Sequence, residues 1–150
     1  MTKSKLRVGI LGAGFLAKTR VRCYRRVYGV EVELVAVAAR SLDRATAFAR
    51  EHGIARACTA EQLCSAADID VVDLCVPNAL HRPFCERAAA HRKHVICTKP
   101  LSAYTGQDLG SSPEESAVQA IDRRRMLAVA VQDADAMLAA TSAAGVQLCK

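Results

Sequence analysis

Short apolar runs alternate along the chain with segments in which apolar residues recur every three or four positions. The runs are typical of buried strands, and the recurring pattern is typical of helices that cover a sheet. We expect strands at about 6–11, 31–39, 56–58, 70–76, 94–98 and 146–149. We expect helices at about 14–28 and 42–52, and further helices that begin near Thr59 and Pro83. This alternation predicts an α/β fold built on a doubly wound parallel sheet.

Several residues mark where the helices should begin and end. Ser41 stands at an N-cap position, and Gly53 follows the same helix as a stop. Thr59 opens a capping-box pattern, and Pro83 is typical of a first helical position. Residues 102–113 interrupt the alternation and should form a loop. Helical spacing then continues to about Ala144, with a break near Arg123–Arg125, and Gly145 ends it.

A glycine-rich turn joins the first expected strand to the first expected helix. Its pattern is G-x-G-x-x-A, with Gly12, Gly14 and Ala17 at the small positions. Gly12 allows a tight turn, Gly14 lets a pyrophosphate approach the backbone, and Ala17 lets the helix pack close to the strand. Phe15 and Leu16 complete a helix N-terminus whose free N–H groups attract an anion. The pattern predicts a dinucleotide site, and the alternative is a tight turn in another kind of α/β protein.

The end of the second expected strand should meet the adenosine ribose of such a dinucleotide. A carboxylate there would bind the ribose hydroxyls of NAD, but this chain has Ala39 and Arg40 instead. Arg40 is suited to a 2′-phosphate, Ser41 adds a hydroxyl, and Arg44 lies one helical turn further on. We therefore favour NADP over NAD. The alternative is that Arg40 stacks on the adenine and that either cofactor binds.

Ligands of such sheets bind in the crevice at the carboxyl ends of the strands, where the strand order reverses. Two further loops should meet the glycine turn there, and their candidate cofactor-binding residues are Pro77, Asn78, His81, Thr98, Lys99 and Pro100. Lys99 is the candidate catalytic residue, because an amine there can orient a substrate hydroxyl or help to move its proton. The alternative for Lys99 is a lone surface lysine. His81 either lines the crevice or caps a loop, and Pro100 is a candidate for a cis peptide bond.

Composition narrows the class of protein. The chain has 150 residues, which suits one domain with its own core. The formal net charge is +6, but the basic residues are scattered, and their densest group lies on the first expected helix. We interpret that group, Arg20, Arg22, Arg25 and Arg26, as a solvated helix face. Aromatic residues do not interleave with it, so a nucleic-acid site is poorly supported.

The thiols and the other candidate ligands do not suggest a metal site. The chain has seven cysteines and no C-x-x-C pattern, so a zinc site or a disulfide framework is not expected. Cys75 and Cys97 lie in apolar runs, where a free thiol acts as a small hydrophobe. Asp133 and Asp135 should be solvated. Reduced thiols, and the lack of a signal peptide or membrane-length apolar run, lead us to expect a cytoplasmic protein.

Four segments together resemble the glucose–fructose oxidoreductase, inositol dehydrogenase and MocA family. They are Val8–Ala17, Ala36–Ala45, Asp73–His81 and Lys93–Leu101. The last two are the most specific, because the family shows a Pro-Asn-x-x-His loop and then a Lys-His-Val strand that runs into Glu-Lys-Pro. The resemblance implies a Rossmann domain that binds NAD(P), with Lys99 as a catalytic residue and His81 in the pocket. It also implies hydride transfer between a nicotinamide cofactor and a sugar, cyclitol or related diol or carbonyl.

Two departures from the family's pattern qualify these expectations. Thr98 replaces the family's glutamate, which helps to hold the nicotinamide ribose. The family's second α/β domain, with the substrate surface and a second catalytic residue, has no counterpart in residues 1–150. We therefore expect residues 1–150 to be the cofactor domain of a truncated chain that is inactive alone, with exposed apolar area that promotes association. The alternatives are a non-catalytic NAD(P)-binding sensor and a basic nucleic-acid module.

Overall fold

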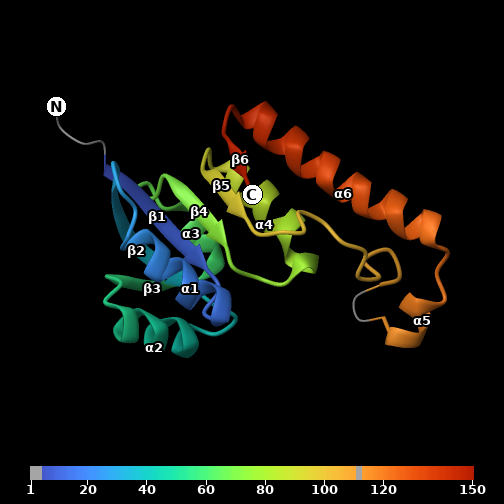
Figure 1. The fold of residues 1–150 in the computed structure, drawn as a ribbon, viewed down its shortest axis with the longest axis horizontal. Coiled ribbons are helices and arrows are strands. Elements are labelled where there is room, and N and C mark those ends of the chain that lie inside the picture. Colours follow the sequence, from blue (N-terminus) through green and yellow to red (C-terminus); the bar gives the residue numbers. More distant parts are fainter. Residues whose placement is uncertain (1–4, 111–112) are drawn as a thin grey trace.

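The fold is built on a parallel sheet of six strands in the order β3-β2-β1-β4-β5-β6. The computed structural model describes residues 5–110 and 113–150. The strands are β1 (Lys5–Leu11), β2 (Glu31–Ala38), β3 (Arg56–Cys58), β4 (Val71–Leu74), β5 (His94–Cys97) and β6 (Leu148–Cys149). Every neighbouring pair runs parallel, and the order reverses between β1 and β4. The predicted doubly wound sheet is therefore confirmed (Figure 1).

Helices cover both faces of this sheet. One face packs against α1 (Phe15–Tyr24) and α2 (Leu42–His52). The other face packs against α3 (Ala60–Ser65), α4 (His81–Ala90) and α6 (Arg123–Ala144). The short helix α5 (Glu115–Gln119) lies beyond the sheet, beside the start of α6 (Figure 1). Each connection between consecutive strands thus carries a helix, as is usual for parallel strands.

The predicted end signals of the helices are present. The Ser41 hydroxyl accepts the Arg44 N–H at 3.4 Å, and Gly53 closes α2 at a φ of 59°. Thr59 and Gln62 form the expected capping box at the start of α3. The break near residue 123 lies where Asp122 caps α6 by accepting the Arg124 N–H at 2.9 Å. Local side-chain chemistry therefore sets these boundaries.

Two helix boundaries differ from the prediction. Helix α1 ends at Tyr24 rather than near residue 28, because Val27 and Tyr28 project into solvent, 46% and 98% exposed, and have no core to pack against. Helix α4 begins at His81, after a 3₁₀ turn at Asn78–Leu80, so Pro83 is its third residue. That position is tolerated because the first N–H groups of a helix have no intrahelical acceptor.

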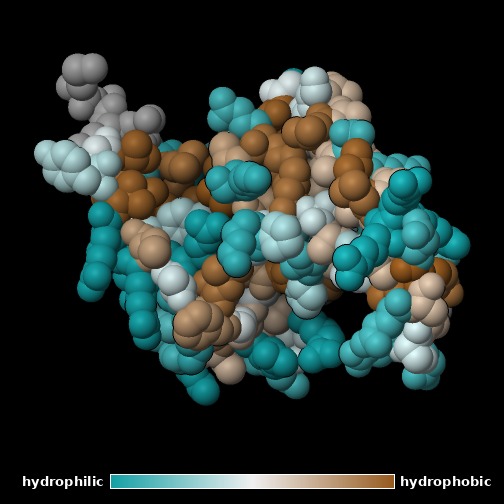
Figure 2. Space-filling view, turned by 45° about the vertical axis from the view of Figure 1, so that its right-hand side comes forward, coloured by the Kyte–Doolittle hydropathy of each residue, from teal (hydrophilic) through white to brown (hydrophobic). Residues whose placement is uncertain are grey.

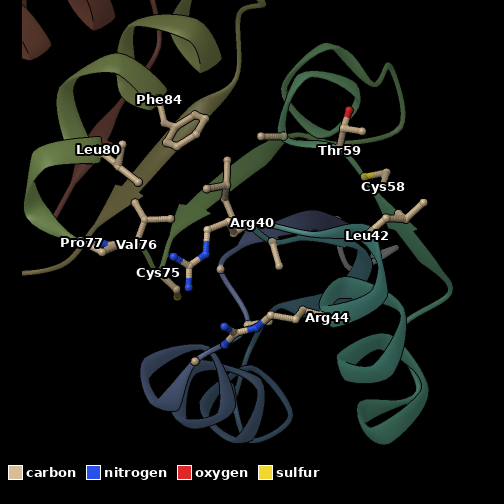
Figure 3. A pocket seen from close by; sticks show the side chains of 16 residues that line it. Arg40, Leu42, Arg44, Cys58, Thr59, Cys75, Val76, Pro77, Leu80 and Phe84 are labelled. Atoms are coloured by element: carbon tan, nitrogen blue, oxygen red, sulfur yellow. The ribbon is translucent and has the colours of Figure 1, made fainter. Parts of the chain in front are cut away.

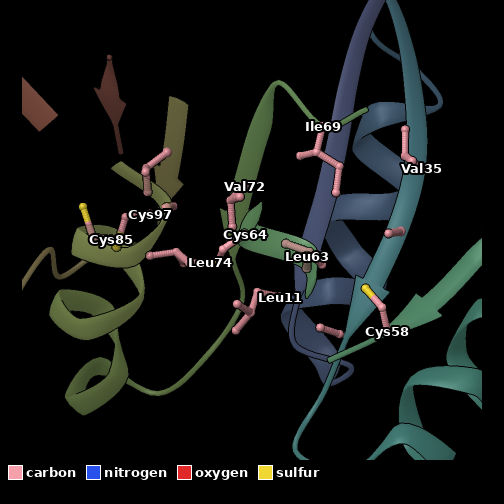
Figure 4. Packing of buried hydrophobic residues seen from close by; sticks show 14 of the residues in the cluster. Leu11, Val35, Cys58, Leu63, Cys64, Ile69, Val72, Leu74, Cys85 and Cys97 are labelled. Carbon is pink, nitrogen blue, oxygen red and sulfur yellow. The ribbon is translucent and has the colours of Figure 1, made fainter. Parts of the chain in front are cut away.

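Cysteine thiols form part of the core. All seven cysteines are free, and the buried members are Cys58, Cys64, Cys85 and Cys97. Several of them pack among Leu11, Leu74 and neighbouring apolar side chains (Figure 4). Burial raises the pKa of Cys64 and of Cys97 to about 11 and that of Cys85 to about 12. These groups act as small hydrophobes, as predicted for Cys97.

The outer face of α6 is apolar. Leu127, Val131 and Leu138 are 64%, 48% and 51% exposed, although all are aliphatic. Figure 2 shows hydrophobic side chains gathered over the upper half of the molecule, the half that holds β5, β6 and α6 in Figure 1. The expected exposed apolar area is therefore present, and association through it stays a prediction. Within residues 5–110 and 113–150, no helix combines the length and the apolarity that crossing a membrane requires.

Candidate functional site

The turn after β1 requires glycine at its first small position. Gly12 has a φ of +126°, a conformation that L side chains rarely adopt. Its N–H donates to Ala38 O at 2.7 Å, which holds the turn against the end of β2. A Cβ at Gly12 would lie 2.2 Å from Cys75 O, inside the backbone that follows β4. The turn therefore brings the ends of β1, β2 and β4 into close contact.

Gly14 and Ala17 have different surroundings. Gly14 is the N-cap of α1, and a Cβ added there would meet no described atom within 4 Å. The space beside its backbone is open, as the approach of a ligand requires. Ala17 is 0% exposed and packs among Val8, Ile10 and other residues of the sheet. It allows the close contact of helix and strand, and it does not face the open space.

A pocket of about 670 Å³ opens beside this turn at the carboxyl ends of the strands. Its lining comes from the loops after β1, β2, β3 and β4 and from the start of α4 (Figure 3). The lining residues are Leu11, Gly12, Ala13, Gly14, Ala39, Arg40, Leu42, Arg44, Cys58, Thr59, Ala60, Cys75, Val76, Pro77, Leu80 and Phe84. The crevice predicted at the β1–β4 reversal is thus a pocket of the size that small ligands occupy.

The charge in this pocket is entirely positive. Arg40 and Arg44 are the charged members of the lining, which contains no carboxylate. Within the described part of the chain, no side chain forms a hydrogen bond or ion pair with either guanidinium group. Figure 3 shows the two side chains extending in the same direction, from the end of β2 and the first turn of α2. Two unpaired arginines can receive an anionic group here.

The opposite part of the lining is apolar and was missed by sequence reasoning. Leu80 and Phe84 lie one helical turn apart at the start of α4, and Leu42 stands at the start of α2. Leu42 and Leu80 are 55% and 40% exposed, which is unusual for leucines beside a core. The sequence signal that could have predicted this surface is the occurrence of apolar residues in the first turns of two helices, each of which follows the end of a strand. Their surfaces suit a flat aromatic ring.

A buried polar network lies beneath the turn, between α1 and β4. Asp73 is 0% exposed, accepts the Tyr24 hydroxyl at 2.7 Å, and has Arg20 Nε at 3.4 Å. Burial raises the pKa of Asp73, and burial beside that carboxylate raises the pKa of Tyr24. The interpretation of Arg20 as part of a solvated face was wrong, because its guanidinium turns inward to this carboxylate. Arg22, Arg25 and Arg26 are exposed.

Five of the predicted cofactor-binding residues line the pocket: Gly12, Gly14, Arg40, Arg44 and Pro77. Of the others, Phe15 stands at the start of α1, 87% exposed, with Leu16 half-buried beside it. Ser41 uses its hydroxyl to cap α2, and Asn78 begins the 3₁₀ turn. Their side chains do not contribute to the lining.

His81 is buried, and its position agrees with the predicted role of capping a loop rather than with the role of lining the crevice. It is 1% exposed, with its ring nitrogens 3.1 Å from Val76 O and 3.1 Å from Leu101 O. It does not line this pocket, because both ring nitrogens face backbone carbonyls, and its expected contact with a cofactor stays a prediction. Its neighbours Val76 and Leu80 form the lining in its place.

The turn after β5 lies on the same edge of the sheet as the glycine turn, two strands away from β1. Thr98 is half-buried, and Lys99 and Pro100 are exposed. The Lys99–Pro100 bond is cis, as suggested by the sequence. None of the three lines the pocket, so their expected contacts with a cofactor stay predictions.

Asp133 is not solvated, contrary to expectation. Its carboxylate accepts Arg82 Nη1 at 2.9 Å and Gln107 Nε2 at 2.8 Å, while Asp135 is exposed. These contacts connect α6 to α4 and to the segment after β5. No cluster of three or more His, Cys, Asp or Glu side chains suited to a metal ion occurs among the residues that the structure describes.

The chain is similar to several oxidoreductases. It is 37% identical over 97 residues to 1,5-anhydro-D-fructose reductase of Ensifer adhaerens, a match that covers 64% of this chain and 28% of the relative. It is 40% identical over 76 residues to scyllo-inositol 2-dehydrogenase (NADP(+)) of Bacillus subtilis, covering 50% of this chain and 23% of the relative. The chain thus spans less than a third of the length of these curated relatives.

Solved structures show the same fold. An NAD binding oxidoreductase from Klebsiella pneumoniae matches with a TM-score of 0.75 and 26% identity, over 97% of this chain and 34% of that protein. A 3-ketoreductase from Actinomadura kijaniata, in complex with TDP-benzene and NADP, matches with a TM-score of 0.70 and 25% identity, over 97% of this chain and 36% of that protein. The model of the oxidoreductase family with an NAD-binding Rossmann fold matches residues 6–120. This chain therefore belongs to the Gfo/Idh/MocA oxidoreductase family and contains its NAD-binding Rossmann fold.

Proposed function

We propose that the pocket binds NADP in preference to NAD, with the 2′-phosphate on Arg40 and Arg44. The observation that carries this proposal is the charge of the lining, in which two unpaired arginines occur without a carboxylate. A carboxylate at the end of β2 would repel a 2′-phosphate, and this chain has Ala39 there. Guanidinium groups bind phosphate through strong, charge-assisted hydrogen bonds.

The remaining parts of the dinucleotide fit the other parts of the lining. The open space at Gly14, where a Cβ would meet no described atom within 4 Å, leaves room for a pyrophosphate against the backbone. The N–H groups at the start of α1 face that space with the partial positive charge of the helix. Leu80 and Phe84 offer an apolar surface for the adenine ring. The residues present therefore fit the cofactor that the fold family implies.

The bound cofactor supplies a hydride donor or acceptor, and this chain's own residues bind and orient it. We assign to Lys99 the task of orienting a substrate hydroxyl and moving its proton, because it follows β5 at the same edge of the sheet. The substrate class we propose is a sugar, a cyclitol, or a related diol or carbonyl. Support comes from relatives whose names specify an anhydrofructose and an inositol. Thr98 offers one uncharged hydrogen bond toward the nicotinamide ribose.

Calorimetric titration of the chain with NADPH and with NADH tests the proposal. We expect NADPH to bind more tightly than NADH, and we expect the difference to shrink as salt screens the arginines. Equal affinity for the two cofactors at low salt would contradict the phosphate assignment. Binding of neither cofactor would contradict the site itself.

A further inference from the structure

The imidazole of His81 lies between backbone carbonyls of two different loops. His81 is the first residue of α4 and is 1% exposed. Nδ1 lies 3.1 Å from Leu101 O, and Nε2 lies 3.1 Å from Val76 O. Both distances are those of N–H···O hydrogen bonds. A neutral ring donates to one of these carbonyls, and a protonated ring donates to both.

The two carbonyls belong to the segments on either side of the proposed reaction site. Val76 follows β4 and lines the pocket, and Leu101 stands two positions after Lys99. The Leu101 side chain packs against the hydrophobic core, but the Lys99 turn receives few hydrogen bonds from other side chains. Among the described residues, the side-chain hydrogen bonds to residues 98–101 are the one from Cys97 Sγ to Thr98 O, at 3.6 Å, and the contact with His81. Within the part of the chain that the structure describes, His81 is therefore the side chain whose ring nitrogens lie within hydrogen-bond distance of both this turn and the wall of the pocket.

We propose that His81 is a positioning residue that sets the location of Lys99 relative to the nicotinamide half of the cofactor, an inference that rests on the proposed NADP site. His81 does not line the pocket, so it acts through the turn that it holds. The Nδ1 contact fixes Leu101 and with it the turn. When the ring is protonated, Nε2 also donates to Val76 O and fixes the ring to the end of β4. Loss of the Nδ1 contact should free Lys99 while the adenosine half of the site stays intact.

Three substitutions separate the two contacts. His81→Phe keeps an aromatic ring and removes both nitrogens. His81→Asn places its amide nitrogen near the position of Nδ1 and keeps a donor for Leu101 O. His81→Gln reaches the position of Nε2 and keeps a donor for Val76 O. Each variant is titrated with NADPH and with 2′-phospho-ADP-ribose, which lacks the nicotinamide ring.

We expect the NADPH Kd to rise about tenfold in His81→Phe and His81→Gln, and to change less than about threefold in His81→Asn, since one hydrogen bond is lost or kept. Binding of 2′-phospho-ADP-ribose should be unchanged in all three variants. An equal loss for both ligands would assign His81 a structural role and overturn the proposal. Equal NADPH affinity of the Asn and Gln variants would also overturn it, and this comparison decides the matter where the Phe variant does not fold.

Titration of the wild-type chain distinguishes failure of the NADP site from failure of the positioning role of His81. If it binds 2′-phospho-ADP-ribose and the His81 variants alter nothing, the NADP site stands and the positioning role is refuted. If it binds neither ligand, the proposed function fails and His81 has no cofactor to serve.

Discussion

Replacing Arg40 by alanine removes one of the two cations that line the pocket. A guanidinium and a phosphate charge about 4 Å apart attract each other by about 4 kcal/mol at an effective dielectric constant of about 20. Arg40 is exposed in the structure, so competition with water reduces the net contribution to about 2 kcal/mol. This loss corresponds to a rise of about 30-fold in the NADPH Kd. NADH lacks the 2′-phosphate, so its Kd should change by less than about threefold.

The assay is a titration of cofactor fluorescence at low and at moderate salt. Arg50→Ala is the matched control, because Arg50 is exposed on the same helix as Arg44 and does not line the pocket. It should leave both affinities unchanged. An Arg40→Ala variant that weakens NADPH and NADH equally would refute the reasoning and would favour stacking of Arg40 on the adenine.

Three further substitutions test other parts of the structure. Gly14→Val should weaken the binding of NADPH and of NADH by more than about tenfold. The melting temperature should stay within a few degrees, since the added side chain enters open space. Unchanged binding would place the site elsewhere. Tyr24→Phe should lower the free energy of unfolding by about 2 kcal/mol, measured by urea denaturation, because the buried carboxylate of Asp73 loses its hydroxyl donor; no change would show that Arg20 suffices. The hydrogen bonds from Arg7 hold the pKa of Asp70 below its ordinary value. They therefore stabilise the folded state fully above the unfolded-state pKa of about 3.9. This stabilisation is lost as the pH falls through the lower folded-state pKa. Asp70→Asn should flatten the decline in the free energy of unfolding from about pH 5 down to about pH 2, and an unaltered profile would contradict this account.

The parts of the fold that depend on local pattern could be predicted from the sequence. The strand runs and the caps at Ser41 and Thr59 needed only the alternation of apolar and polar residues and short-range side-chain chemistry. The reversal between β1 and β4 followed from the crossover rule and placed the crevice correctly. The extent of α1 did not follow, because its last predicted turn has good helical spacing but no sheet beneath it.

The parts of the site that depend on distant contacts could not be predicted. Asp133 was expected to be solvated because Arg82 and Gln107, its partners, are far away along the chain. The side chain of His81 could equally serve a pocket or a loop until the positions of Val76 and Leu101 were known. The need for glycine in a tight turn can be recognised from the neighbouring residues in the sequence. The orientation of a long side chain cannot, because it depends on the packing of the whole domain.

The distribution of thiols has a practical consequence for labelling. Maleimides react with thiolates, and burial keeps the core thiols protonated at neutral pH by raising the pKa of Cys64, Cys85 and Cys97. Cys23 on α1 and Cys149 on β6 are exposed, and neither lines the pocket. Two dyes can therefore be attached to the natural sequence without mutagenesis, and energy transfer between them would follow the separation of the first helix from the last strand.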